Sequence, residues 1–99
     1  MDERSPPELD PILHQPVRTR IAAYLATRGE TTFTELKQAL AITDGNLEAH
    51  LKKLVAASYV TAHKQTGRGR PQTLYALSAT GEKAFAQYVA SLQAVLGDG

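Results

Sequence analysis

The sequence predicts an α+β domain, mainly α, with a three-helix core, a two-stranded hairpin and a long C-terminal helix. Apolar residues recur at helical spacing in four segments, and two β-rich segments flank a loop that contains glycine and proline. The 99 residues suffice for one compact domain, and the absence of cysteine excludes disulfides and thiolate metal sites. We expect a disordered lead-in over residues 1–8, the main domain over residues 9–78, and the terminal helix over residues 79–99, packed on the same domain.

The first helix is expected from about Val17 to Arg28. Its apolar positions fall at offsets 0, 4, 7 and 8, which form one face of a helix. These positions are Val17, Ile21, Tyr24 and Leu25. Gly29 fits the glycine that commonly follows the last turn of a helix. Upstream, Asp10 and Pro11 fit the N-cap and first position of a short helical turn, which Pro16 brings to an end.

A brief strand and a short second helix are expected next. Thr31–Phe33 is short and β-branched, as edge strands often are. Thr34 is expected to cap a helix over about Glu35–Ala41. The inner face of this helix would be Leu36, Ala39 and Leu40.

The third helix has the clearest start signal of the chain. Thr43 is a good N-cap, and Ile42 and Leu47 stand at the spacing of a hydrophobic staple. This helix should extend from about Asp44 to Ala57. Its apolar positions repeat the offsets 0, 4, 7 and 8 and are Leu47, Leu51, Leu54 and Val55.

A β-hairpin and a long last helix complete the pattern. Tyr59–Gln65 and Thr73–Leu77 are expected to pair as strands across a glycine- and proline-containing loop. Ser78 is placed to cap a helix over about Ala79–Leu96. The wide apolar stripe of this helix consists of Phe85, Tyr88, Val89, Leu92, Val95 and Leu96. From Tyr88 onward the stripe should find little to pack on, and an exposed apolar stripe usually marks an interface. We expect these six residues to form a dimer interface; the alternative is packing onto the first helix of the same chain.

The order of elements is that of a winged helix-turn-helix, in which the second helix of the pair suits the DNA major groove. The outer face of the third helix is small and polar near its start, which lets the backbone approach base edges. Asn46 can pair bidentately with adenine, and the free N–H groups of the first turn can hold a phosphate. The candidate DNA-contacting residues are Thr43, Gly45, Asn46, Ala49, His50, Lys53, Lys64, Arg68 and Arg70. The alternative is an ordinary solvated helix face.

The net charge of +1 hides an asymmetry along the chain. Residues 1–10 carry four acids and one base, whereas residues 49–81 carry five bases and no acid. A basic block within a folded region favours an anionic partner. Arg68 and Arg70 lie on a glycine-containing loop, which suits a narrow minor groove or a row of phosphates. The alternative is a basic face and a turn that serve only solubility.

The chain resembles winged-helix transcriptional regulators of the MarR/ArsR type, most closely the compact MarR-related group. The matching stretches are residues 14–18, 33–36, 42–54, 58–60, 69–73 and 75–81. The resemblance implies a homodimer, joined largely by the terminal helices, that binds a pseudo-palindromic operator. It also implies that Thr43, Gly45, Asn46, Ala49 and His50 lie at or near the DNA, with Arg68 and Arg70 on the wing.

Two departures from that pattern bear on the DNA face. Similar proteins often have a small polar residue and then an arginine where this chain has Glu48 and Ala49. Glu48 can accept from a cytosine amine, but we expect it to pair with Lys52 one turn on. Ser58 stands where the family usually has glycine, so it should adopt a left-handed conformation.

The leading interpretation is a transcriptional regulator, a repressor, that binds double-stranded DNA as a homodimer. The alternative is a winged-helix protein–protein module without DNA binding. No nucleophile–base pair or carboxylate pair indicates an enzyme, and the three histidines are too far apart for a metal site, so no cofactor is expected. A small-molecule effector would have to bind at the dimer junction. The longest apolar run has six residues and no signal sequence is visible, which favours a cytoplasmic protein without membrane contact.

Overall fold

The computed structural model describes residues 8–66 and 69–97, so residues 1–7 of the expected lead-in lie outside the described residues. The elements in chain order are α1 (Pro16–Arg28), β1 (Thr31–Thr32), α2 (Phe33–Leu40), α3 (Asp44–Ala56), β2 (Val60–Gln65), β3 (Gln72–Leu77) and α4 (Ala79–Gly97). The strands form one antiparallel sheet in the order β1-β3-β2. The expected winged helix-turn-helix architecture is therefore confirmed, with a short third strand added to the hairpin.

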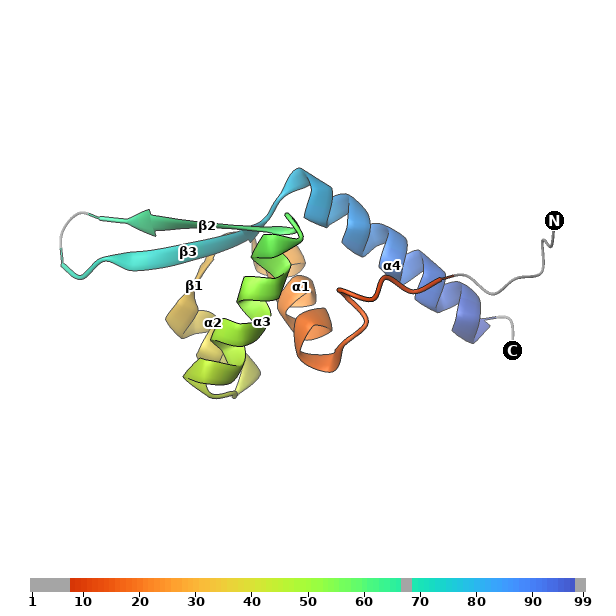
Figure 1. Cartoon of the computed structure of the whole chain (residues 1–99), viewed down its shortest axis with the longest axis horizontal. Helices are drawn as coiled ribbons and strands as arrows, with labels where there is room; N and C mark the ends of the chain where they lie inside the picture. The colour runs from red at the N-terminus through yellow and green to blue at the C-terminus, as the bar shows by residue number, and fades with distance from the viewer. Residues whose placement is uncertain (1–7, 67–68, 98–99) are drawn as a thin grey trace.

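The molecule is elongated, with extents of 57 × 25 × 20 Å. In Figure 1, α1, α2 and α3 gather at the centre, the β2–β3 hairpin projects to one side, and α4 projects to the opposite side. The hairpin register pairs Val60 with Leu77 at its base and Gln65 with Gln72 near its tip. The hairpin is thus a projecting wing beside the helix-turn-helix.

The core lies where the central helices meet the base of the sheet and the N-terminal turn, which comprises residues 10–14. Its fully buried apolar side chains include Leu13, Ile21, Leu36, Leu47 and Leu54. The predicted inner face of α3 is confirmed for Leu47, Leu51 and Leu54. Val55, expected on the same face, is instead 40% exposed, because it lies about 80° around the helix from Leu47, at the edge of the apolar stripe.

The helix α2 begins two residues earlier than the sequence predicts. Its N-cap is Thr32, not Thr34, and the Thr32 hydroxyl accepts from the Glu35 N–H at 3.1 Å. Thr32 is also the last residue of β1 paired with β3, so the end of the strand fixes the start of the helix. Ala39, expected on the inner face, is exposed because it lies about 100° around the helix from Leu40, at the edge of the face that Leu36 and Leu40 bury.

A compact corner joins α3, β2 and α4. Ser58 has φ +67°, so its predicted left-handed conformation is confirmed. The Tyr59 carbonyl accepts from the Ser78 N–H at 3.0 Å, and the Ser78 hydroxyl donates to the Ser58 carbonyl at 2.7 Å. The same hydroxyl accepts from the Gly81 N–H at 2.9 Å, which confirms Ser78 as the cap of α4. Gly81 is buried here, and a Cβ on it would lie 1.9 Å from the Tyr59 carbonyl oxygen.

The apolar stripe of α4 divides into a packed half and a free half. Tyr88 is only 4% exposed, and its hydroxyl lies 2.9 Å from Nδ1 of His14. The expectation that the stripe is unpacked from Tyr88 onward is therefore wrong for this residue, because the N-terminal turn folds back over it. Val95 and Leu96 are 46% and 70% exposed. Among the residues that the structure describes, none of the helices combines the length and the hydropathy of a transmembrane span.

Candidate nucleic-acid interface

The helix pair α2–α3 is fixed at its turn by two contacts of basic side chains. Ala41 at the end of α2 has φ +56°, which reverses the chain toward Thr43. Arg20 of α1 donates from Nη2 to the Leu40 carbonyl at 2.9 Å and so satisfies the end of α2. Lys37 of α2 forms an ion pair of 2.8 Å with Asp44, the first residue of α3. These contacts hold the start of α3 at a defined angle to α2.

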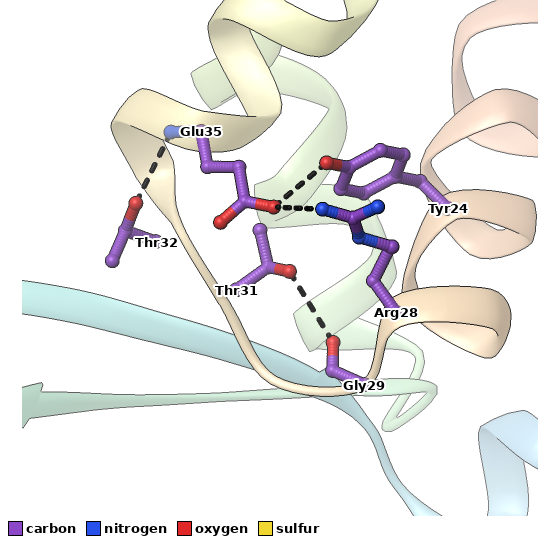
Figure 2. A network of polar contacts seen from close by, with 6 residues as sticks. All are labelled: Tyr24, Arg28, Gly29, Thr31, Thr32 and Glu35. Atoms are coloured by element: carbon purple, nitrogen blue, oxygen red, sulfur yellow. Dashed lines mark hydrogen bonds and ion pairs between the residues drawn. The ribbon is translucent and has the colours of Figure 1, made fainter.

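The network in Figure 2 fixes the other end of α2 against α1 and β1. Glu35 accepts from the Tyr24 hydroxyl at 2.7 Å, and its carboxylate lies 3.6 Å from the Arg28 guanidinium. The hydrogen bond to Glu35, with burial, raises the pKa of Tyr24. The Arg28 guanidinium also lies over the Tyr24 ring, 5.5 Å from its centroid. Because both ends of α2 are tied to α1, the pair presents α3 rigidly.

The outer face of α3 carries the candidate contact residues together. The Thr43 hydroxyl accepts from the Asn46 N–H at 3.2 Å, which confirms Thr43 as the N-cap. Asn46, Ala49 and Lys53 are exposed at offsets 0, 3 and 7, which is one side of a helix. Gly45 is exposed at the start of this side, with open space around its Cα. The face thus has small or polar side chains at its start and a cation, Lys53, toward its end.

The two acids of α3 lie differently from what the sequence suggests. Asp44 is paired with Lys37, which offsets its charge near the start of the helix. Glu48 forms no ion pair with Lys52 within 4 Å, so that expectation is wrong. The pKa of Tyr75 in β3 is raised by burial first and by the charge of Glu48 second. Glu48 is exposed on α3 and has no ion-pair partner among the described residues.

His50 is held by a residue that sequence reasoning did not single out. Arg18 of α1 lies with Nη1 3.0 Å from His50 Nδ1, and the ring is half-buried. Burial, then the charges of Arg18 and Lys53, lower the pKa of His50. Arg18 stands in the sequence stretch that matches the family, but no local signal connects it with a residue 32 positions away.

Two further candidate DNA-contacting residues, Lys64 and Arg70, are exposed on the wing. Beyond Val60, every residue of β2 is exposed, including Lys64. Arg70 is exposed where the chain returns toward β3, whereas Arg68 lies outside the described residues. His63 lies 3.6 Å from Glu30, which links the wing to the loop before β1. Lys64 and Arg70 therefore sit on an element separate from the α3 face.

A hollow of about 750 Å³ lies between the N-terminal segment and α4. Its lining includes Asp10, Ile12, Tyr59, Tyr88 and Ser91. Asp10 caps the N-terminal turn through its Oδ1 and accepts from the Tyr59 hydroxyl at 2.6 Å through its Oδ2. That hydrogen bond, followed by burial, raises the pKa of Tyr59. The hollow is lined by both polar and apolar groups.

A helix-turn-helix with an exposed polar recognition face and a basic wing defines a DNA-binding domain of the regulator class. A profile of the family described as "Winged helix DNA-binding domain" matches residues 17–96. The uncharacterized protein MJ0432 of Methanocaldococcus jannaschii is 38% identical over 78 residues, which cover 79% of this chain and 85% of that protein. The chain therefore belongs to the winged helix DNA-binding domain family.

Solved structures of transcriptional regulators have the same fold. The transcriptional regulator homologue from Pyrococcus horikoshii OT3 has a TM-score of 0.84 and 30% identity, covering 88% of this chain and 86% of that chain. Rv0081 of Mycobacterium tuberculosis has a TM-score of 0.72 and 26% identity, covering 88% of this chain and 84% of that chain. The resemblance to MarR/ArsR-type regulators is confirmed. The family and fold are those of transcriptional regulators and not of enzymes.

Proposed function

We propose that this protein is a transcriptional repressor that binds a pseudo-palindromic DNA operator as a homodimer. The observation that carries the proposal is the exposed face of α3, which combines an open helix start with Asn46 and Lys53 on one side. Beside it stands a wing whose outer strand is exposed and basic. Together they match the two grooves and the phosphate row that a winged helix meets. Action on chromosomal DNA would require the cytoplasmic location expected from the sequence.

The two elements divide the recognition of DNA. Asn46 lies one turn into α3, where side chains reach base edges, and its amide suits adenine. Thr43, Gly45 and Ala49 are small, so the backbone at the start of α3 can approach the groove. The cationic side chains bind phosphates or the minor groove and give affinity without sequence preference. They are Lys53, Lys64, Arg68 and Arg70.

A homodimer is supported by the free end of α4. Val95 and Leu96 are exposed at the end of α4, which projects away from the core (Figure 1). Phe85, Val89 and Leu92 are half-buried and extend this apolar surface back toward the domain. Two such helices can cover each other as an isologous pair, which would place two α3 helices on one face of the duplex.

An effector would find its site in the hollow between the N-terminal segment and α4, which lies beside the proposed dimer helix. Among the structural neighbours, NadR has been solved in complex with 4-hydroxyphenylacetate, at 25% identity and a TM-score of 0.72. The small molecule bound to that neighbour supports the proposal that this chain also binds a small-molecule effector. The mixed polar and apolar lining of the hollow suits a small molecule that carries groups of both kinds.

A matched pair of lysines tests the proposal against a protein–protein module. Lys52 and Lys53 are adjacent and both exposed, but only Lys53 shares the side of Asn46. Lys53→Ala should reduce the slope of log affinity against log salt by about one unit per protomer, and Lys52→Ala should leave it nearly unchanged. Asn46→Ala should cost about 1–3 kcal/mol on the preferred operator and little on scrambled DNA. Equal effects of the two lysine variants, or a uniform loss with Asn46→Ala, would contradict these roles.

A further inference from the structure

The guanidinium of Arg18 connects three segments of the chain. Its Nε donates to the Ile12 carbonyl at 2.6 Å, and its Nη1 donates to His50 Nδ1 at 3.0 Å. Its backbone N–H donates to the side chain of Gln15, the N-cap of α1, at 2.8 Å. The side chain is therefore fixed between the N-terminal turn and α3, and it cannot rotate without losing a partner.

This contact determines where the imidazole carries its proton. A guanidinium has only donors and stays charged, so His50 Nδ1 must be the acceptor. A neutral imidazole with an acceptor at Nδ1 carries its hydrogen on Nε2. His50 is thereby held as the Nε2–H tautomer, in one ring orientation.

The remaining donor, His50 Nε2, is accessible and unpaired among the described residues, because it has no hydrogen-bond partner there and is not one of the buried unsatisfied atoms. His50 follows Asn46 by four residues and precedes Lys53 by three, so the three share one side of α3. A fixed neutral donor at this place can reach a phosphate or a base acceptor.

We propose that Arg18 is a positioning residue for DNA binding, which holds the His50 ring as a hydrogen-bond donor between Asn46 and Lys53. The inference rests on the proposed function. The charged groups that act on the ring are Arg18 of α1 and Lys53 of α3 itself, and both are cations. No charged group on the described part of β2, which also packs on α3, acts on it. Both cations favour the neutral ring, which agrees with the lowered pKa of His50.

The test combines nitrogen NMR of the histidine rings with DNA-binding titrations across pH at fixed salt, using a random-sequence duplex. The unaltered protein should show His50 as the Nε2–H tautomer. Arg18→Met should release the ring into a tautomer mixture and move its titration midpoint upward, toward the ordinary value of about 6.5. Between pH 7.5 and pH 5.5, this variant should gain about fivefold more affinity than the unaltered protein, because a charged donor now meets the phosphates.

Two further variants make the result specific. His50→Gln keeps an amide donor near the Nε2 position but does not titrate, so Arg18→Met with His50→Gln should lose the added pH dependence. Arg18→Lys keeps the charge but cannot bridge Ile12 and His50, so it should also give a tautomer mixture while moving the titration midpoint less than Arg18→Met does. Its tautomer is the measurement to use if Arg18→Met does not fold. An unchanged tautomer in Arg18→Met or Arg18→Lys, or an Nδ1–H tautomer in the unaltered protein, would overturn the proposal. Absence of DNA binding by the unaltered protein, with the expected tautomer present, would instead overturn the proposed function.

Discussion

Gly81 is the position where a single methyl group should most disturb this fold. A Cβ built on Gly81 lies 1.9 Å from the Tyr59 carbonyl oxygen, and real Cβ contacts essentially never fall below 3.0 Å. In Gly81→Ala the two must separate by at least 1.1 Å, the difference between these distances. The Tyr59 carbonyl belongs to the backbone and the position of a Cβ is fixed by the backbone, so no side-chain rotation can relieve the contact.

The energetic cost follows from what the shift would break. The Tyr59 carbonyl accepts from the Ser78 N–H at 3.0 Å, and the Gly81 N–H donates to the Ser78 hydroxyl at 2.9 Å. Overpacking of this kind costs about 1–3 kcal/mol, and each disturbed hydrogen bond adds about 1 kcal/mol. Alanine returns at most about 1 kcal/mol through its better helix propensity. We therefore expect Gly81→Ala to lower the free energy of unfolding by about 2–4 kcal/mol.

Urea unfolding at one fixed protein concentration measures this effect. Gly45→Ala is the matched control, because Gly45 is also helical but a Cβ added to it would have nothing within 4 Å. The control should be stabilised, by up to about 1 kcal/mol. The reasoning fails if Gly81→Ala is as stable as the unaltered protein, or if the two alanine variants change stability in the same direction.

Three other predictions test separate parts of the structure. Ser58→Gly should stabilise the fold by up to about 1 kcal/mol, because glycine adopts the left-handed backbone conformation of this position without strain. Ala57→Gly is the control and should destabilise the fold, because Ala57 has an ordinary φ of −82°. A lower melting temperature for Ser58→Gly would refute this prediction. Burial and two neighbouring cations lower the pKa of His50, so the unfolded state binds more protons and stability should fall as the pH falls through about 6.5. Urea unfolding at pH 7.5 and 5.5 checks this, and His50→Gln should show a smaller drop. Aspartate at both Val95 and Leu96 should give monomers by analytical ultracentrifugation; a dimer that persists would place the interface elsewhere.

Signals that act within one helical turn could be predicted from the sequence. Thr43 caps α3 as expected, because the cap and the Asn46 N–H that it binds are three residues apart. The left-handed backbone conformation of Ser58 could likewise be predicted, because this serine stands at a helix end where the family usually has glycine. The recognition face of α3 followed from the same local periodicity, since burying the leucines turns the polar residues outward.

Features that depend on distant partners could not be predicted. The start of α2 is set by pairing of β1 with β3, which no residue near Thr34 reveals. Tyr88 is buried because the N-terminal turn brings His14 to it from 74 positions away. Arg18 reaches His50 in the same way. The periodicity of one segment reports which face is apolar, but not which other segment covers it.

The salt dependence of duplex DNA binding by the unaltered protein tests the central claim most directly. A dimer that uses Lys53, Lys64, Arg68 and Arg70 in each protomer would neutralise about eight phosphates. The slope of log affinity against log salt should then be about −7, and affinity should fall by about 10⁴ between 50 and 200 mM salt. Binding that is absent at low salt, or a slope near zero, would contradict DNA recognition by this winged helix and favour a protein–protein module.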